Sequence, residues 1–362
     1  MAEGRRFELL VPCGTAVFKT APLDHSGTPP GRIKHTGPWR GAQAASPAVG
    51  LGALDCRGVT ILSGLLPVFL ILALGVAARR LGLVDGLAAA GLNRLVANLA
   101  LPAFLVSEIG TSTLRVSFSL HLVGAVLTTT AVVTVLALGA ALLMRLPASQ
   151  RGVLAQAAMR GNVAYVGFPV ILAALGEAGL RRAAITAALL IPLMSLIAVS
   201  VLEQFRTQHD RPSLLLFKVL GNPLVIASLL GLLLAAVEWH PWSWLAQTLR
   251  VLADFALPAA LLALGAQLEF RQWHGVWRAT VVAAVLKQLV APVLGLIALR
   301  ALGTPHLELS VGVLMLAAPT AVATYPVAAE LGGDTDLAGA CVLVTTAAAF
   351  VVFAGWSLLL GL

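Results

Sequence analysis

Long apolar runs alternate with short polar segments from about residue 61 to the end of the chain. A run of about 20 apolar residues is the length that a helix needs to cross a bilayer. The pattern predicts ten membrane-spanning helices, at about 61–79, 87–109, 118–144, 150–174, 180–202, 213–236, 242–267, 277–300, 306–331 and 335–361. The predicted fold is therefore an all-α polytopic membrane protein.

Two of the predicted spans contain residues that break helices. The fourth span includes Arg160–Val170 (RGNVAYVGFPV), and the ninth includes Ala317–Val327 (AAPTAVATYPV). Lipid offers no partner for the backbone groups that such a break releases, so both segments must lie inside protein or line a cavity. Interrupted spans at corresponding positions of two halves indicate a transporter binding site.

The second half of the chain repeats the first. Matching residues are separated by 156 or 157 positions: Pro67 and Gly75 match Pro223 and Gly231, Asn98–Ala103 matches Asp254–Ala259, and Phe168–Val170 matches Tyr325–Val327. Five helices are an odd number, so a second copy of five enters the membrane from the opposite side. The sequence therefore predicts two inverted five-helix repeats, 58–204 and 213–362, with helices 4 and 9 broken.

Composition agrees with a membrane protein and explains the charge. The chain of 362 residues is 59% hydrophobic and 11% charged, whereas soluble domains are about 25% charged. The net charge of +8 does not indicate nucleic acid as a partner, because the basic residues lie in short loops between apolar runs. Loops after odd-numbered spans carry more Arg, which predicts that they face the cytoplasm and that both termini lie outside.

Residues 1–57 are polar and basic and are interrupted by Gly and Pro. They contain neither the apolar region of a signal peptide nor an amphipathic period. We expect either a disordered extension or translation begun upstream of the true start. The three cysteines and seven histidines show no disulfide or metal-ligand spacing, and we find no Walker A loop, so no cofactor or metal is expected.

Polar side chains inside the spans are candidates for a site, because they are costly in lipid and usually functional. Arg160 and Lys287 lie about ten residues into their spans, Gln288 follows Lys287, and Asn98 and Asp254 precede prolines. We expect these residues to line a polar cavity, with Asn98, Asp254 and Gln288 in coupling or support. In the alternatives, Arg160 and Asp254 form a structural ion pair, or Lys287 extends along its helix to the membrane surface.

The two breaks add groups that suit a polar substrate. Asn162 can donate and accept hydrogen bonds, and Pro319 occupies the matching position of the second repeat. Tyr165, Thr320 and Tyr325 offer hydroxyls. Each hydroxyl taken alone is expected to bond to a nearby backbone carbonyl, but together they indicate a site.

Breaking a helix also creates new helix ends. The N-terminal ends carry partial positive charge and attract anions. Arg160 and Lys287 add two full positive charges to the predicted pocket. The expected substrate is therefore a small organic anion.

Several motifs, by their order and spacing, carry a resemblance to a known family: Leu92–Val96 with Leu101–Ala103, Arg160–Asn162 with Gly167–Val170, Gly221–Leu224, Leu262–Ala266, and Ala318–Ala321. They resemble the auxin efflux carrier family, which includes plant PIN-FORMED-type auxin carriers and bacterial permeases for malonate-like dicarboxylates. The resemblance covers nearly all of the chain except the N-terminal extension.

The resemblance implies ten helices in two inverted repeats, with helices 4 and 9 crossed and broken, Pro169 and Pro326 as the crossing prolines, and Asn162 and its neighbours at the substrate. It implies a scaffold of helices 1, 2, 6 and 7, often dimeric, so a second copy is an expected partner besides the lipid bilayer. The chain lacks the long central loop of many plant carriers. A permease of a bacterial inner (plasma) membrane is therefore the closer likeness.

The leading hypothesis is a secondary carrier for small organic anions such as malonate or malate, working by alternating access around the crossed helices. One alternative is a sodium- or proton-coupled symporter or antiporter of bile-acid-symporter-like architecture, although few carboxylates lie near the crossing. Another is a membrane sensor or channel that uses the same pocket. An intramembrane hydrolase would need a Ser/His, paired Asp or His-Glu-x-x-His arrangement, and we find none, so no enzyme is expected.

Overall fold

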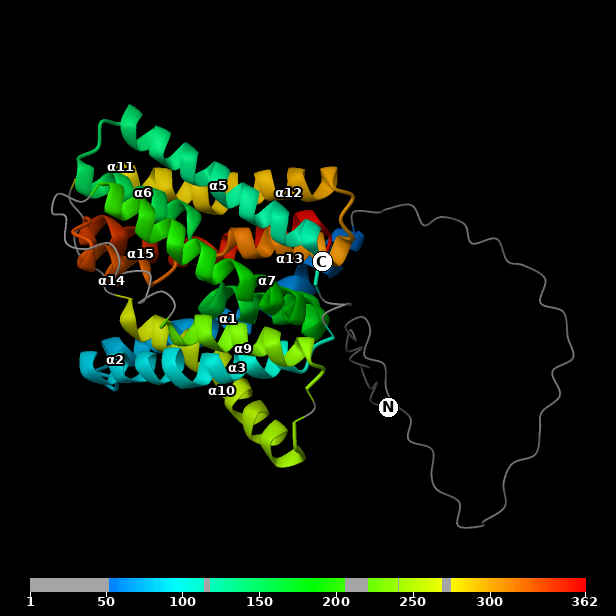
Figure 1. The fold of residues 1–362 in the computed structure, drawn as a ribbon. Helices are drawn as coiled ribbons and strands as arrows, with labels where there is room; N and C mark the ends of the chain where they lie inside the picture. The colour runs from blue at the N-terminus through cyan, green and yellow to red at the C-terminus, as the bar shows by residue number, and fades with distance from the viewer. Residues whose placement is uncertain (1–51, 114–117, 206–220, 240, 269–274) are drawn as a thin grey trace, which may run out of the picture. The chain divides into compact units, whose positions relative to one another are not determined.

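The computed structural model describes residues 52–113, 118–205, 221–239, 241–268 and 275–362, and all of its regular elements are helices (Figure 1). In chain order they are α1 (Gly52–Arg80), α2 (Gly86–Leu95), η1 (Val96–Ala100), α3 (Leu101–Gly110), α5 (Leu120–Leu143), α6 (Ala148–Met159), η2 (Val163–Gly167), α7 (Phe168–Gln204), α9 (Pro223–Ala236), α10 (Ser243–Gln267), α11 (Trp277–Val285), η3 (Leu286–Val290), α12 (Ala291–Ala301), α13 (His306–Ala317), α14 (Thr324–Glu330) and α15 (Thr335–Leu360).

The contacts divide the chain into two units, Met1–Val59 and Thr60–Leu362, and the site lies in the second. Of the predicted N-terminal extension, residues 1–51 lie outside the described residues, whereas 52–57 belong to α1. The predicted linker between the repeats falls almost entirely in 206–220, also outside the described residues. The predicted domain boundaries therefore remain predictions.

Seven helical segments within the described ranges are long and apolar enough to cross a membrane. They confirm an all-helical multi-pass membrane protein but not the count of ten spans. Two apolar helices, α9 and α13, have only 14 and 12 residues. Conversely, α7 continues for 37 residues across one bend at Gly176 (φ 65°, ψ −166°), where the sequence predicts the end of one span and the start of the next.

The bounds of the helices recur at a nearly constant offset. The segments Gly86–Gly110 and Ser243–Gln267 differ by 157 at both ends (243 − 86, 267 − 110). The helices that precede the two breaks, α6 and α13, differ by 158 at both ends (306 − 148, 317 − 159). This regularity supports the internal repeat, while the inversion of its two halves remains a prediction.

Three π-helical turns interrupt the helices, and each is followed after two positions by a proline: Pro102 after η1, Pro169 after η2 and Pro292 after η3. A proline inside a helix has no N–H to donate, and its ring clashes with the carbonyl four residues earlier. The wider turn relieves that clash and keeps the helix continuous. All three turns contribute side chains to the site or its support: Asn98, Tyr165, Lys287 and Gln288.

Close contact between α1 and α10 depends on two glycines. A Cβ atom at Gly75 would lie 2.4 Å from the carbonyl oxygen of Leu262, and one at Gly265 would lie 2.1 Å from that of Leu72. Neither distance is compatible with a side chain, so only glycine allows this approach. Because α10 also packs against α3, and α3 against α9, these helices form one packed group.

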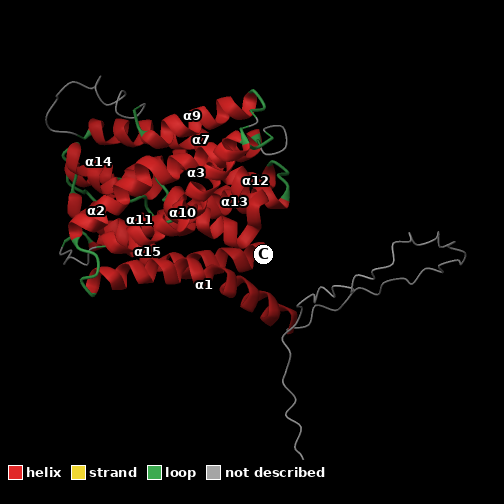
Figure 2. Cartoon of the chain, turned by 90° about the horizontal axis from the view of Figure 1, so that it is seen from below, coloured by secondary structure: helices red, strands yellow, loops and turns green. Residues whose placement is uncertain are grey.

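Helix α15 lies beside α1 within the second unit (Figure 2), where the ring of Phe69 is 5.2 Å from that of Phe350 and meets it edge-on. Other apolar side chains point outward. Leu74, Val135 and Leu233 are each more than 60% exposed. Such an apolar surface is expected where a protein contacts lipid instead of water.

Candidate functional site

The two helix breaks lie against each other and pair through their backbones. Gly161 and Thr320 form an antiparallel β-bridge. The N–H of Asn162 donates to the carbonyl oxygen of Pro319 at 2.6 Å, and the N–H of Ala321 donates to that of Arg160 at 2.9 Å. Each break therefore satisfies polar groups that the other leaves free, which is the requirement for irregular backbone at membrane depth.

The pairing involves the residues N-terminal to the predicted crossing prolines. Pro169 is buried in the first turn of α7, and Pro326 is exposed near the start of α14. The backbone bonds join Arg160 and Asn162 to residues around Thr320 instead. Pro319, predicted as the repeat counterpart of Asn162, is thus its direct hydrogen-bond partner.

A cavity of about 690 Å³ opens beside the paired breaks. Among the described residues, four charged side chains line it: Arg79, Arg160, Lys287 and Asp336. Three basic groups and one carboxylate give this described lining a formal charge of +2 (3 − 1). Arg79 lies in the last turn of α1, and Asp336 lies in the first turn of α15. Arg160 and Lys287 lie at the paired breaks.

The two cations at the breaks each lie at the C-terminal end of a half-helix. Arg160 follows the last residue of α6, and its Nη2 donates to Ser195 Oγ at 3.2 Å. Lys287 is 1% exposed, and its Nζ donates at 2.8 Å to the carbonyl oxygen of Leu316 in the last turn of α13. A hydrogen-bond donor is favourable at both places, because helix C-termini leave carbonyl oxygens unpaired.

Asn162 offers the cavity a free donor. Its side chain is 5% exposed, and its Nδ2 has no partner among the described protein atoms. Buried amide groups nearly always find a partner, so an unpaired one beside a cavity points to a ligand. Its backbone caps the helix that follows, since its carbonyl oxygen accepts from the N–H groups of Val166 and Gly167.

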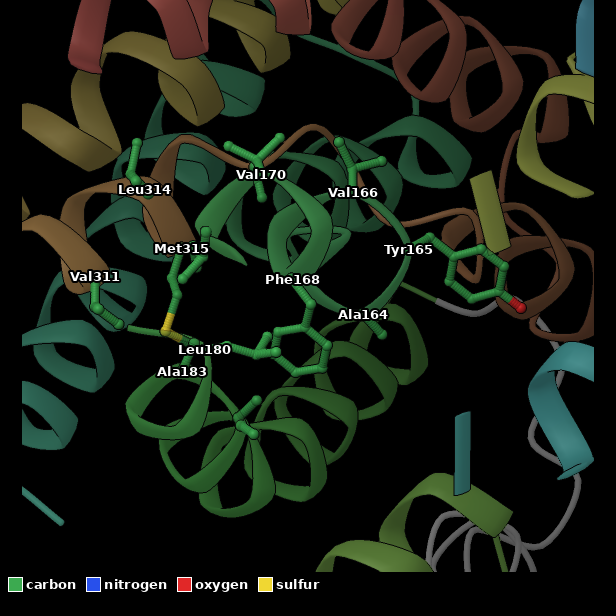
Figure 3. Packing of buried hydrophobic residues seen from close by; sticks show 14 of the residues in the cluster. Ala164, Tyr165, Val166, Phe168, Val170, Leu180, Ala183, Val311, Leu314 and Met315 are labelled. Carbon is green, nitrogen blue, oxygen red and sulfur yellow. The ribbon is translucent and has the colours of Figure 1, made fainter. Parts of the chain in front are cut away.

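Tyr165 and Tyr325 both line the cavity, in different ways. The hydroxyl of Tyr165 donates at 2.7 Å to Asn93 Oδ1 in α2, and its ring points away from Phe168 and Met315 (Figure 3). Tyr325 is 43% exposed. The remaining predicted residues that line the cavity are Asn98 on η1 and Pro326 on α14, and both are exposed.

Five predicted residues do not line the cavity: Pro169, Pro319, Thr320, Gln288 and Asp254. Thr320 is fully buried, and its hydroxyl donates to the carbonyl oxygen of Ala157 at 2.9 Å. That carbonyl is one of the last four of α6, which have no partner within their own helix. The hydroxyl of Thr320 therefore bonds to the backbone and does not reach the cavity, as expected for a hydroxyl taken alone.

Gln288 and Asp254 are also placed differently from the expectation of a polar cavity. The side-chain Nε2 of Gln288 donates to the backbone carbonyl oxygen of Thr345 at 2.8 Å. The backbone carbonyl oxygen of Gln288 accepts from Trp356 Nε1. It thus ties η3 to α15, which is a support role. Asp254 is exposed on α10, and among the described residues no ion pair joins it to Arg160. Lys287 does not extend to the surface, because its amine is held at the break.

We expect Thr320→Val to lower stability without changing substrate affinity. The variant keeps the side-chain shape but leaves the Ala157 carbonyl unpaired, which costs about 1–3 kcal/mol. Thermal unfolding of the purified protein should show the loss, while the KM for an anion stays within about twofold. Thr128→Val, at an exposed position on α5, is the control. A KM raised about tenfold or more would place the hydroxyl at the substrate.

Other polar residues of the site were missed by the sequence analysis. Asn93, Ser195 and Thr345 hold Tyr165, Arg160 and the N–H of Thr320. Gln156 is fully buried one turn before Arg160, with neither amide atom paired among the described residues. Asn93 and Gln156 had a usable signal, namely an amide within or beside an apolar run. Ser195 and Thr345 had none, because single hydroxyls are common in spanning helices.

Apolar packing adjoins the cavity. Met315 and Leu316 line the cavity. Met315 also packs with Phe168, Leu180, Val311 and Leu314 in the buried cluster (Figure 3). The ring of Phe168 lies 5.4 Å from that of Phe104 in α3. The apolar core therefore borders the lining of the cavity.

Comparisons with known proteins agree with this geometry. A family model described as "Membrane transport protein" matches residues 60–357. The chain is 28% identical to a Rhizobium meliloti protein named "Putative malonate transporter" over 300 residues, 78% of this chain and 90% of that protein. It is 26% identical to a Methanothermobacter thermautotrophicus protein named "Uncharacterized transporter" over 307 residues, 82% of this chain and 97% of that protein.

Proposed function

Because the chain belongs to the membrane transport protein family, the auxin efflux carrier family, we propose that it is a secondary active transporter for small organic anions, carboxylates such as malonate or malate. It is not an enzyme in this proposal. The observation that carries the proposal is the convergence of Arg160, Lys287 and the unpaired Asn162 amide on one cavity at the paired breaks. The name of the Rhizobium relative supports a short dicarboxylate as the substrate.

In this proposal the chain crosses the membrane ten times. The count is reached when α7 is divided at Gly176 and the shorter helices α9 and α13 are included with their neighbours. The two halves are inverted repeats, and their broken helices cross where Gly161 meets Thr320. The recurring helix bounds support this architecture.

The proposed orientation follows from loop charge. Arg79, Asn222, Leu268 and Thr335 line the cavity at or near helix ends, next to the loops that follow odd-numbered spans. The positive-inside rule assigns these loops to the cytoplasm and both termini to the outside, in a bacterial inner membrane. The conformation would then be the one that admits substrate from the cytoplasm.

Transport would follow from movement of the paired breaks as a unit. The cations attract the carboxylate, and the Asn162 amide and the N-terminal end of η2 donate hydrogen bonds to it. The scaffold would consist of α1, α2–α3, α9 and α10, in a homodimer. Displacement of the remaining helices against it would close the cytoplasmic opening and separate Phe168 from Phe104 on the other side.

Flux measurements in proteoliposomes test this proposal. We expect saturable uptake of labelled malonate or malate. Uptake of a labelled indole carboxylate is measured in the same way, to test the alternative substrate. Arg160→Gln should reduce kcat/KM by about 10-fold to 100-fold, because a charged hydrogen bond contributes about 1.5–3 kcal/mol. Arg250→Gln, at an exposed position on α10, is the control and should behave as wild type. Absence of flux for all three anions in folded protein would overturn the carboxylate assignment.

A further inference from the structure

Lys287 is a buried amine that reaches the centre of the site. Its Nζ would lie only 3.1 Å from a Cβ atom placed on Gly161, so the amine is at the β-bridge itself. It lines the cavity although it is 1% exposed. Among the described residues, its hydrogen-bond partner is the carbonyl oxygen of Leu316. Because a neutral amine also donates hydrogen bonds, this contact does not require the ammonium form.

No acidic group of the described chain compensates the charge of Lys287, since no carboxylate oxygen lies within 4.0 Å of its nitrogen. The elements packed against η3 carry eight titratable groups. One of them, Cys341, lies inside α15. The others lie near helix ends: His121, Arg151, Arg278, Arg300, His306, Glu308 and Asp336. Arg160 in the facing break adds a second positive charge. A buried ammonium without a counter-ion is unfavourable.

The choice of lysine at this position stands out from the rest of the chain. Of 24 basic residues, 20 are Arg, and Lys287 is the single lysine among the described residues. Arginine stays protonated in proteins, whereas a buried lysine loses its proton readily. Of the two basic groups at the paired breaks, Lys287 is therefore the one that is able to titrate.

From this geometry we propose that Lys287 is the proton-carrying residue of the transporter, taking up one proton with each bound carboxylate and releasing it with the substrate. The inference rests on the proposed anion transport. Without substrate, the site favours the neutral amine. A bound carboxylate supplies the missing counter-charge, so Nζ accepts a proton from water in the cavity and becomes the ammonium.

The same step runs in reverse where the substrate leaves. Departure of the carboxylate removes the counter-charge, and the ammonium returns its proton to water on that side. One proton and one anion cross together, so flux is symport of an anion with a proton. An inward-directed proton gradient would thus drive accumulation of the anion.

Proton-linked binding gives a direct test with malonate as the probe. Calorimetric titrations of the purified full chain in two buffers of different ionisation enthalpy measure the protons taken up for each malonate bound. Because the site without substrate favours the neutral amine, wild type should take up close to one proton for each malonate bound at about pH 8. Malonate binding without proton uptake at this pH would overturn the inference and leave the proposed function intact.

Two variants separate titration from charge. Lys287→Arg keeps a permanent charge, so any malonate that it binds or transports should carry no linked proton. Lys287→Gln removes the titration and the charge together. A proton-to-malonate ratio near one in either variant would overturn the role of Lys287. The ratio, unlike the rate, does not depend on how well the variant folds or turns over.

A proton gradient distinguishes this inference from the proposed function. Wild-type proteoliposomes should accumulate malonate above its external concentration when the outside is acidic, whereas Lys287→Arg should only equilibrate it. Equilibration without accumulation in wild type would support the carrier and overturn its proton coupling. Neither binding nor flux of malonate, malate or an indole carboxylate in wild type would overturn both proposals.

Discussion

Asn162→Asp is expected to have the largest effect of any single substitution on anion transport. The change keeps the shape of the side chain and the backbone bond to Pro319, but it replaces a free donor with a negative charge. Two like charges about 4 Å apart repel by about 4 kcal/mol at an effective dielectric constant of about 20. We expect kcat/KM for malonate to fall about 1,000-fold in proteoliposomes.

Two further variants make this result specific. Asn162→Ala removes only the donor, so its loss should be smaller, about 10-fold to 100-fold. Gln247→Ala removes an exposed amide on α10 away from the cavity and should transport like wild type. Because Asn162 Nδ2 has no partner among the described residues, thermal stability should change little in Asn162→Ala. Flux that survives Asn162→Asp would place the substrate away from the breaks.

Gly265→Ala is expected to have the largest effect on stability. Its Cβ would meet the carbonyl oxygen of Leu72 at 2.1 Å, and backbone atoms on α1 cannot rotate away. The two helices would have to separate along the contact, and such overpacking costs about 1–3 kcal/mol or more. We expect a lower unfolding temperature and a smaller monodisperse fraction after purification in detergent.

Glycines with free space provide the matched control. A Cβ at Gly139, in the middle of α5, would meet no atom within 4 Å. Gly139→Ala should therefore be neutral or slightly stabilising, because Ala favours a helix more than Gly does. Gly75→Ala, on the other side of the contact, should resemble Gly265→Ala. Equal unfolding temperatures for Gly139→Ala and Gly265→Ala would show that the helices separate without cost.

The sequence predicts the site well where the physics is local. Hydrophobic runs locate the helices, and Gly and Pro within them locate the two breaks near Arg160 and Pro319. Such features depend on the bilayer and on backbone chemistry alone. The bend at Gly176, where φ is positive, lies between the predicted spans 150–174 and 180–202, so the sequence also locates this division.

Side-chain direction is where the sequence is insufficient. Asn162 faces the cavity and Thr320 faces α6, although each is a polar residue in a break. Asp254 is the counterpart of Asn98 in the repeat, yet it does not line the cavity as Asn98 does. These differences arise from which neighbour has an unpaired carbonyl or an open space, and only the assembled helices determine that.

The two breaks pair through main-chain atoms, so the pairing does not depend on which side chains line the cavity. The bonds that join Asn162 to Pro319 and Ala321 to Arg160 use main-chain atoms only. A mutation can therefore alter the side chain at 160 or 162 without removing a single bond of the crossing. The backbone pairing does not depend on the side chains that would contact a substrate. Related proteins could therefore differ in substrate while keeping the same paired breaks.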